Sequence, residues 1–171
     1  MTVNLTVSLA GIPLRNPVLT AAGPMSRDGS TLVDAARGGV GGLVAKTVTD
    51  SEAMRRLTKM SKWRYLDEQQ NGCGGKGPRR FTFYGRSGLA EEEPEEWMEE
   101  LKEAQAAALQ NDCVLIGSVG GTTPENWAKL AQMVEDTGIK SVELNFGCPH
   151  PSEMKGAQTG MLTGQDKEAA S

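Results

Sequence analysis

The chain has 171 residues, 38% of them hydrophobic and 23% charged, and its formal net charge at pH 7 is −4. These values are ordinary for one soluble globular domain and exclude fibrous and disordered classes. No apolar run reaches the ~18 to 20 residues that span a bilayer, the N-terminus lacks the order of a signal peptide, and the basic residues are dispersed. We therefore expect a cytoplasmic protein with neither a membrane nor a nucleic acid as partner.

The first part of the chain reads as strand, helix, strand. Residues 16–23 form an apolar run that ends in small residues and predicts a strand. Asp28 with Ser30 can cap a helix over residues 30–39, and residues 41–49 predict a second strand. Alternating strand and helix signals favour parallel βα units.

A long segment, residues 50–88, follows the second strand. It is rich in Gly, Arg, Lys and aromatic residues and carries no clear periodicity. Because it is too long for a plain connection, we expect a functional loop or a small subdomain. A helix from Glu95 to Leu109 is predicted next, because Pro94 and several acidic residues suit a helix N-terminus.

The remaining elements repeat the same alternation. Residues 113–121 predict a third strand, and Thr122 or Thr123 can cap a helix over residues 124–138. Residues 140–148 predict a fourth strand, and residues 164–171 read as the start of a helix.

Four strands are fewer than a closed (β/α)₈ barrel needs, since that fold typically takes about 250 residues. The chain is then a fragment of a longer polypeptide, a half-barrel completed by another chain, or a self-standing sheet of four βα units.

Ligands of parallel α/β folds gather at the carboxyl ends of the strands, so the residues there are the candidates for chemistry. After the first strand, Ala22 and Gly23 would let a flat ligand approach the backbone, although a tight turn explains them equally well. Lys46, before Thr47, is a cation in an apolar run. Its ammonium group needs an anionic or electron-rich partner there unless the side chain extends to solvent. Asn145 can offer a donor and an acceptor to a heterocycle.

The stretch NFGCPH places a thiol and the only histidine of the chain just beyond the fourth strand. Cys148 could transfer a proton at carbon if its pKa is tuned, although a lone cysteine is most often a small buried apolar residue. His150 is a binding candidate that could equally be a surface residue. Cys73 and Cys113 are interpreted as structural. The three cysteines match neither a disulfide framework nor a metal motif, so no metal is expected.

Four stretches together resemble the dihydroorotate dehydrogenase and dihydropyrimidine dehydrogenase family: GIPLRNPVLTAAGP, GGLVAKTVT, NWAKLAQMVEDTGIKSVELNFGCPH and GMLTGQD. The sequence CPH followed by GM and GQD is closer to the dihydropyrimidine branch. The resemblance implies the N-terminal half of a (β/α)₈ TIM barrel over residues 1–171, with FMN at the carboxyl-terminal mouth.

The resemblance also implies roles for the candidate residues. Ala22 and Gly23 would meet the flavin ring through the backbone, Lys46 and Thr47 would hold its polar edge, and Asn145 would hold flavin or substrate. Cys148 would be the acid and base that exchanges the C5 proton of a pyrimidine-type ring while hydride passes between C6 and flavin. His150 would contact substrate.

The sequence departs from the family in three ways. An asparagine that binds substrate in the family is absent near Gly85, the loop between His150 and Gly160 is longer, and the later strands are missing. An ene-type reductase of another cyclic substrate and a non-catalytic half-barrel bound to a partner chain are therefore alternatives. The expected partners are the remaining half of the barrel, in an oligomer, and a small pyrimidine-type substrate; the electron acceptor is left open.

Overall fold

The computed structural model describes residues 3–60, 62–75, 77–149 and 159–171. Its centre is a four-stranded parallel sheet whose strands follow one another in space in the same order as in the sequence. The strands are β3 (Leu19–Thr20), β4 (Gly42–Val44), β8 (Val114–Val119) and β9 (Val142–Leu144). Consecutive parallel strands with intervening helices are the arrangement of a (β/α) barrel, and the α/β half-barrel predicted from the sequence is confirmed.

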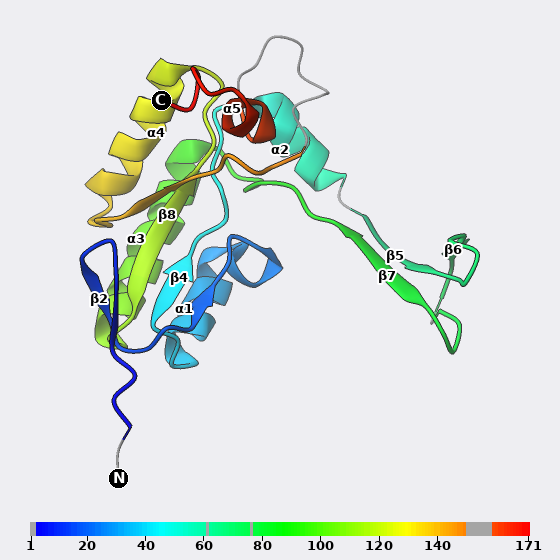
Figure 1. The fold of residues 1–171 in the computed structure, drawn as a ribbon, viewed down its shortest axis with the longest axis horizontal. Coiled ribbons are helices and arrows are strands. Elements are labelled where there is room, and N and C mark those ends of the chain that lie inside the picture. The colour runs from blue at the N-terminus through cyan, green and yellow to red at the C-terminus, as the bar shows by residue number, and fades with distance from the viewer. Residues whose placement is uncertain (1–2, 61, 76, 150–158) are drawn as a thin grey trace.

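Three helices pack on the sheet and correspond to the predicted ones: α1 (Gly29–Arg37), α3 (Pro94–Gln110) and α4 (Pro124–Asp136). Figure 1 shows α1 and α3 behind β4 and β8. On α3 the buried residues Trp97, Leu101, Ala104 and Ala108 recur every three or four positions, so one face of this helix meets the core. This helix contacts α1, β8 and α4.

Local capping fixes where the helices begin. The Asp28 side chain accepts a hydrogen bond from the backbone N–H of Thr31 at the start of α1. Burial raises the pKa of Asp28, but hydrogen bonds from Ser30, Thr31 and Arg27 outweigh it and lower the pKa to about 2. Thr123, one of the two expected caps, caps α4 by accepting from Asn126 N–H.

Residues 50–88, expected to be a functional loop or a small subdomain, contain regular structure. It holds α2 (Glu52–Lys59) and a three-stranded antiparallel sheet in the order β6-β5-β7. These strands are β5 (Lys62–Leu66), β6 (Gly72–Cys73) and β7 (Thr82–Arg86). They form an arm, residues 62–86, that extends away from the parallel sheet in Figure 1. A sequence reading misses this sheet because each strand's partner lies up to 24 residues away, as in the pair of residues 62 and 86.

A hairpin, a 3₁₀ turn and a short helix complete the described chain. An N-terminal hairpin, β1 (Val7–Leu9) and β2 (Ile12–Leu14), precedes the parallel sheet, and a 3₁₀ turn, η1 (Pro24–Ser26), precedes α1. Near the C-terminus α5 (Met161–Gln165) ends where residues 164–171 had suggested that a helix begins. Within the described residues, no helix is both long and apolar enough to cross a membrane.

Asp50 joins the loop after β4 to the loop after β8. Its carboxylate accepts hydrogen bonds from Thr122 N at 2.9 Å, Thr122 Oγ1 at 2.5 Å and Asn126 Nδ2 at 2.7 Å. The two loops at the carboxyl ends of neighbouring strands are thereby held together.

We expect Asp50→Ala to lower the free energy of unfolding by about 2 to 3 kcal/mol, because three donors lose a charged acceptor. Urea denaturation measures the change. Asp34→Ala, at a carboxylate whose side chain is 79% exposed on α1, is the matched control and should stay within about 0.5 kcal/mol of the wild type. Equal losses in the two variants would contradict the role of Asp50 in joining the loops.

Candidate functional site

The carboxyl ends of the parallel strands bring five of the predicted site residues to one region. Ala22 and Gly23 follow β3, Lys46 and Thr47 follow β4, and Asn145 follows β9. Hydrogen bonds link Lys46 to Ala22 and Asn145 to Thr47, so residues separated by up to 98 positions in the sequence meet. The region is therefore assembled by the parallel topology of the sheet.

Lys46 is a buried cation at this edge. Its side chain is 6% exposed, and within the described residues its ammonium group has one hydrogen bond, to Ala22 O at 3.4 Å. Burial lowers the pKa of Lys46, and the thiolate form of the nearby Cys148 partly opposes that change. An ammonium group held in this way attracts an electron-rich or anionic group.

A chain of hydrogen bonds crosses three strand ends. Asn145 Nδ2 donates to Thr47 Oγ1 at 3.0 Å, Thr47 Oγ1 lies 2.8 Å from Ser118 Oγ, and Ser118 Oγ donates to Glu143 Oε1 at 2.9 Å. Because the Ser118 hydroxyl hydrogen is used on Glu143, Thr47 must be the donor to Ser118. The order of donors is thus fixed from Asn145 to the Glu143 carboxylate.

The other end of the Asn145 amide positions the start of the following loop. Asn145 Oδ1 accepts from the backbone N–H of Gly147 at 3.2 Å and of Cys148 at 3.0 Å. Cys148 O in turn accepts from Met161 N at 3.0 Å. Gly160 has a φ of +55° and lies so close that a Cβ there would meet Cys148 O at 2.5 Å. Cys148 is therefore held from both sides, and glycine is required at position 160.

Sequence reasoning missed Ser118, Glu143 and Gly160. Ser118 was visible only as part of the small-residue end of the third strand, SVGG, and Glu143 as an alternating polar residue of the fourth. The parallel register pairs these two positions directly across β8 and β9. His150, predicted to contact substrate, lies outside the described residues.

The remaining two thiols differ from Cys148 in their surroundings. Cys113 is 6% exposed, and burial raises the pKa of its thiol. Cys73 is half-buried on the arm, where it donates weakly to Asn71 O. The charges that act on the Cys113 thiol are those of Arg15 and Asp112.

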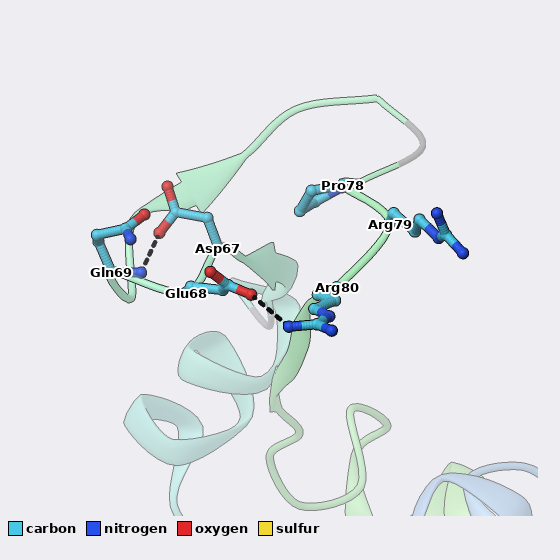
Figure 2. Close-up of a pocket in the computed structure, with 6 residues that line it drawn as sticks. All are labelled: Asp67, Glu68, Gln69, Pro78, Arg79 and Arg80. Carbon is cyan, nitrogen blue, oxygen red and sulfur yellow. Dashed lines mark hydrogen bonds and ion pairs between the residues drawn. The ribbon is translucent and has the colours of Figure 1, made fainter.

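A polar cavity of about 310 Å³ opens beside Lys46. Its wall comes from four parts of the chain: the loop before α1, Lys46, α2 with the base of the arm, and the segment leading into α3. The lining residues are Pro24, Arg27, Asp28, Lys46, Thr58, Trp63, Ser87, Gly88, Leu89, Glu91 and Glu92. Neither Cys148 nor Asn145 lines this cavity. A larger open pocket, about 630 Å³, lies at the far end of the arm (Figure 2), away from the strand ends.

Gly85, where the family's asparagine is missing, lies on β7 opposite Trp63. A Cβ at this position would meet the Trp63 ring at Cζ3 and Cε3. An asparagine therefore fits here only if the Trp63 ring moves, so the departure at position 85 and the tryptophan at position 63 belong together.

We expect Asn145→Leu to expose the backbone amides of Gly147 and Cys148, because both lose the acceptor Oδ1. Their hydrogen-exchange protection, measured by NMR, should fall about tenfold, the effect of one lost hydrogen bond. Asn145→Asp keeps an acceptor oxygen at this position and is the matched variant that should retain protection. Unchanged protection in Asn145→Leu would show that the loop is positioned by other contacts.

These features define a partial parallel α/β barrel with a candidate ligand site, which contains a buried lysine, at the carboxyl ends of its strands. Residues 91–167 match the family model described as dihydrouridine synthase (Dus). These residues run from the start of α3 through β8, α4 and β9 to just beyond α5.

Named relatives match over most of the chain. The catalytic subunit of dihydroorotate dehydrogenase B (NAD(+)) from Methanothermobacter thermautotrophicus is 31% identical over 168 residues, 96% of this chain and 46% of the relative. The corresponding protein from Methanocaldococcus jannaschii is 28% identical over 150 residues, 85% of this chain and 42% of the relative. Dihydropyrimidine dehydrogenase (NADP(+)), chloroplastic, from Arabidopsis thaliana is 29% identical over 161 residues, 92% of this chain and 36% of the relative.

These matches confirm the resemblance to the dihydroorotate and dihydropyrimidine dehydrogenases that the sequence motifs indicated. Both branches are represented at similar identity, so the preference for the dihydropyrimidine branch stays a prediction. The chain spans less than half the length of the curated relatives described here.

Proposed function

We propose that this chain supplies half of the active site of an FMN-dependent oxidoreductase that interconverts the C5–C6 single and double bond of a pyrimidine-type ring. The expected substrates are dihydropyrimidines or dihydroorotate. The observation that carries the proposal is Lys46, a buried cation that has one long hydrogen bond among the described residues, borders a polar cavity and interacts electrostatically with Cys148. The names dihydroorotate, dihydropyrimidine and dihydrouridine share one chemical feature, a pyrimidine ring reduced at C5–C6.

The residues around Lys46 are compatible with a flavin. Thr20 Oγ1, at the end of β3, is buried and lacks a hydrogen-bond partner among the described residues, so it can serve a ligand. Gly23 has open space where a side chain would be, its nearest neighbour being Ala21 O at 3.9 Å, so a flat ring could approach the backbone there. A bound flavin would supply the two-electron acceptor or donor.

Residues of the chain itself would bind the ring, orient it and transfer the proton. Lys46 would provide positive charge to the ring system, and Thr47 and Asn145 would orient the site through the chain of hydrogen bonds that ends at Glu143. The second N–H of Asn145 is the part of its amide left for a ligand, because Thr47 and two backbone amides occupy the rest. Cys148 would remove the C5 proton in the oxidising direction and return it in the reducing direction.

We also propose that further βα units complete the barrel, from the same polypeptide or from another chain. Two facts support this. The relatives are more than twice as long as the matched region, and β3 and β9 are the outer strands of the described sheet. Open edges of a parallel sheet are normally covered.

Flavin bleaching tests the proposed reaction. The whole expressed protein, loaded with FMN under anaerobic conditions, should lose the yellow absorbance of oxidised flavin when dihydrouracil or dihydroorotate is added. Bleaching with neither compound would exclude a pyrimidine-type substrate.

Gly85 favours a second candidate on the same fold, an ene-type reductase of another cyclic substrate, because the Trp63 ring occupies the space of the family's substrate-binding asparagine. This candidate predicts that chemically reduced enzyme is reoxidised by a cyclic enone such as cyclohexenone, and that dihydropyrimidines cause no bleaching. The two substrate classes are therefore separated by the same absorbance signal.

A further inference from the structure

The cavity beside Lys46 carries opposite charges from different segments of the chain. Lys46 borders it just after β4, and Glu91 and Glu92 border it from the segment that leads into α3. No ion pair joins the lysine to either glutamate in the part of the chain that the structure describes. The cavity, of about 310 Å³, therefore keeps a cation and two carboxylates apart and has room for a ring between them.

The other charged residues described around this cavity, Arg27 and Asp28, pair with each other. Arg27 Nε lies 3.0 Å from Asp28 Oδ2, and Asp28 stays ionised because its pKa is about 2 despite its burial. This pair therefore adds no net charge, and Lys46 balances one of the two glutamates. In the proposed function the charge of Lys46 serves the flavin ring. The space left for a substrate is then bordered by carboxylates that no cation of the cavity balances.

Glu92 is the more enclosed of the two glutamates. Its Oε2 accepts a hydrogen bond from the backbone N–H of Glu91 at 3.0 Å. Burial raises the pKa of Glu92, its own backbone N–H and that of Glu91 oppose this change, and the charges of Glu100 and Glu91 raise the pKa further. These surroundings disfavour another negative charge, whereas an N–H donor from a ligand would stabilise the ionised carboxylate.

The rest of this side of the cavity is apolar or already hydrogen-bonded. Trp63, 47% exposed, and the buried Leu89 supply apolar wall. Thr58 Oγ1 accepts from Leu89 N at 2.8 Å and donates to a backbone carbonyl of α2 at 3.2 Å, so its hydroxyl is used within the chain. Ser87 is neutral and cannot select a ligand by charge. Among the described residues on this side, selection by charge therefore falls to the two glutamates.

We propose that Glu91 and Glu92 determine specificity at this site, by accepting hydrogen bonds from ring N–H groups and repelling a ring that carries a carboxylate. The inference rests on the proposed function, because it takes the charge of Lys46 to be used by the flavin. A dihydropyrimidine ring presents N–H donors, for which an ionised carboxylate is an acceptor. Dihydroorotate adds a carboxylate to a space already bordered by two, and like charges placed together weaken binding.

Uracil and orotate test the proposal, because these two rings differ by one carboxylate. Equilibrium dialysis of each radiolabelled ring against the whole expressed protein, loaded with FMN at about pH 8, measures both dissociation constants with the glutamates ionised. We expect the wild type to bind uracil at least about 100-fold more tightly than orotate. Glu91→Gln with Glu92→Gln should lower this ratio at least about tenfold, mainly through tighter binding of orotate. Glutamine keeps the size of the side chain and an acceptor oxygen, so rejection of orotate by size would leave the ratio unchanged.

Glu95→Gln with Glu96→Gln is the matched control, because it removes the same charge from the exposed first turn of α3, outside the lining of the cavity. It should leave the ratio within about twofold of the wild type. An equal change in the control, an unchanged ratio in Glu91→Gln with Glu92→Gln, or a wild type that binds orotate as tightly as uracil would each overturn this inference and leave the proposed function in place. Binding of neither ring would overturn the proposed function itself, and this inference with it.

Discussion

Cys148→Ala should slow turnover of a dihydropyrimidine about 10² to 10⁴-fold while leaving flavin binding intact, if the proposed reaction is correct. The Cys148 thiol is the proposed acid and base, and it interacts electrostatically with the buried Lys46. Its backbone is fixed by Asn145 Oδ1 and Met161 N, so a small side-chain change should not move the loop. The loss should therefore appear in the proton transfer and not in the binding of flavin.

The measurement is anaerobic flavin reduction by substrate in a stopped-flow instrument, together with flavin fluorescence titration for binding. Cys73→Ala is the matched control, because that thiol is half-buried on the arm and remote from the strand ends. It should react at the wild-type rate. Equal rates of flavin reduction in Cys148→Ala and in the wild type would rule out Cys148 as the proton acceptor.

Lys46→Met should weaken flavin binding about 100-fold, because it removes a buried cation that the bound ligand would neutralise. The same substitution should not lower the free energy of unfolding of the ligand-free protein. Lys46 is 6% exposed and its ammonium group has one hydrogen bond, of 3.4 Å, to the part of the chain that the structure describes, whereas methionine fills a similar volume without a charge.

The pH dependence of the free energy of unfolding distinguishes an effect of the Lys46 charge from an effect of side-chain packing. Burial lowers the pKa of Lys46 in the fold, so the unfolded chain binds more protons between the folded pKa and 10.5. The contribution of Lys46 to the free energy of unfolding therefore rises with pH through that window and is unfavourable below it. Lys46→Met should lack this rise.

Lys129→Met, at an exposed position on α4, is the matched control for both measurements and should change neither. Denaturation by urea at several pH values and flavin titration provide the two readouts. If Lys46→Met bound flavin with the wild-type affinity, Lys46 would not bind flavin and the proposed function would lose its main support.

Local patterns were sufficient to predict α1, α3 and α4 and the four parallel strands, but not α2 or α5. Asp28, Thr123 and Pro94 mark the beginnings of α1, α4 and α3, because a cap or a proline acts within three residues of itself. Lys46 could be singled out for the same reason, since a charged residue inside an apolar run is unusual whatever surrounds it.

Contacts between distant segments could not be predicted in this way. The pairing of β5 with β7 joins positions up to 24 residues apart, and β1 with β2 forms a hairpin that the composition of the N-terminus did not indicate. The glycine at position 85 looked like a simple departure from a family pattern until the ring of Trp63 was found across the strand pair.

The sequence by itself determined the α/β class, the starts of the helices and the candidates at the strand ends, because propensity, capping and hydrophobic alternation act over a few residues. Only the tertiary structure decided that Lys46 is buried beside Cys148, that Asn145 connects through Thr47 and Ser118 to Glu143, and that cations and aromatic rings form one projecting arm. These features depend on strand register and burial, which arise when segments far apart in the chain pack together.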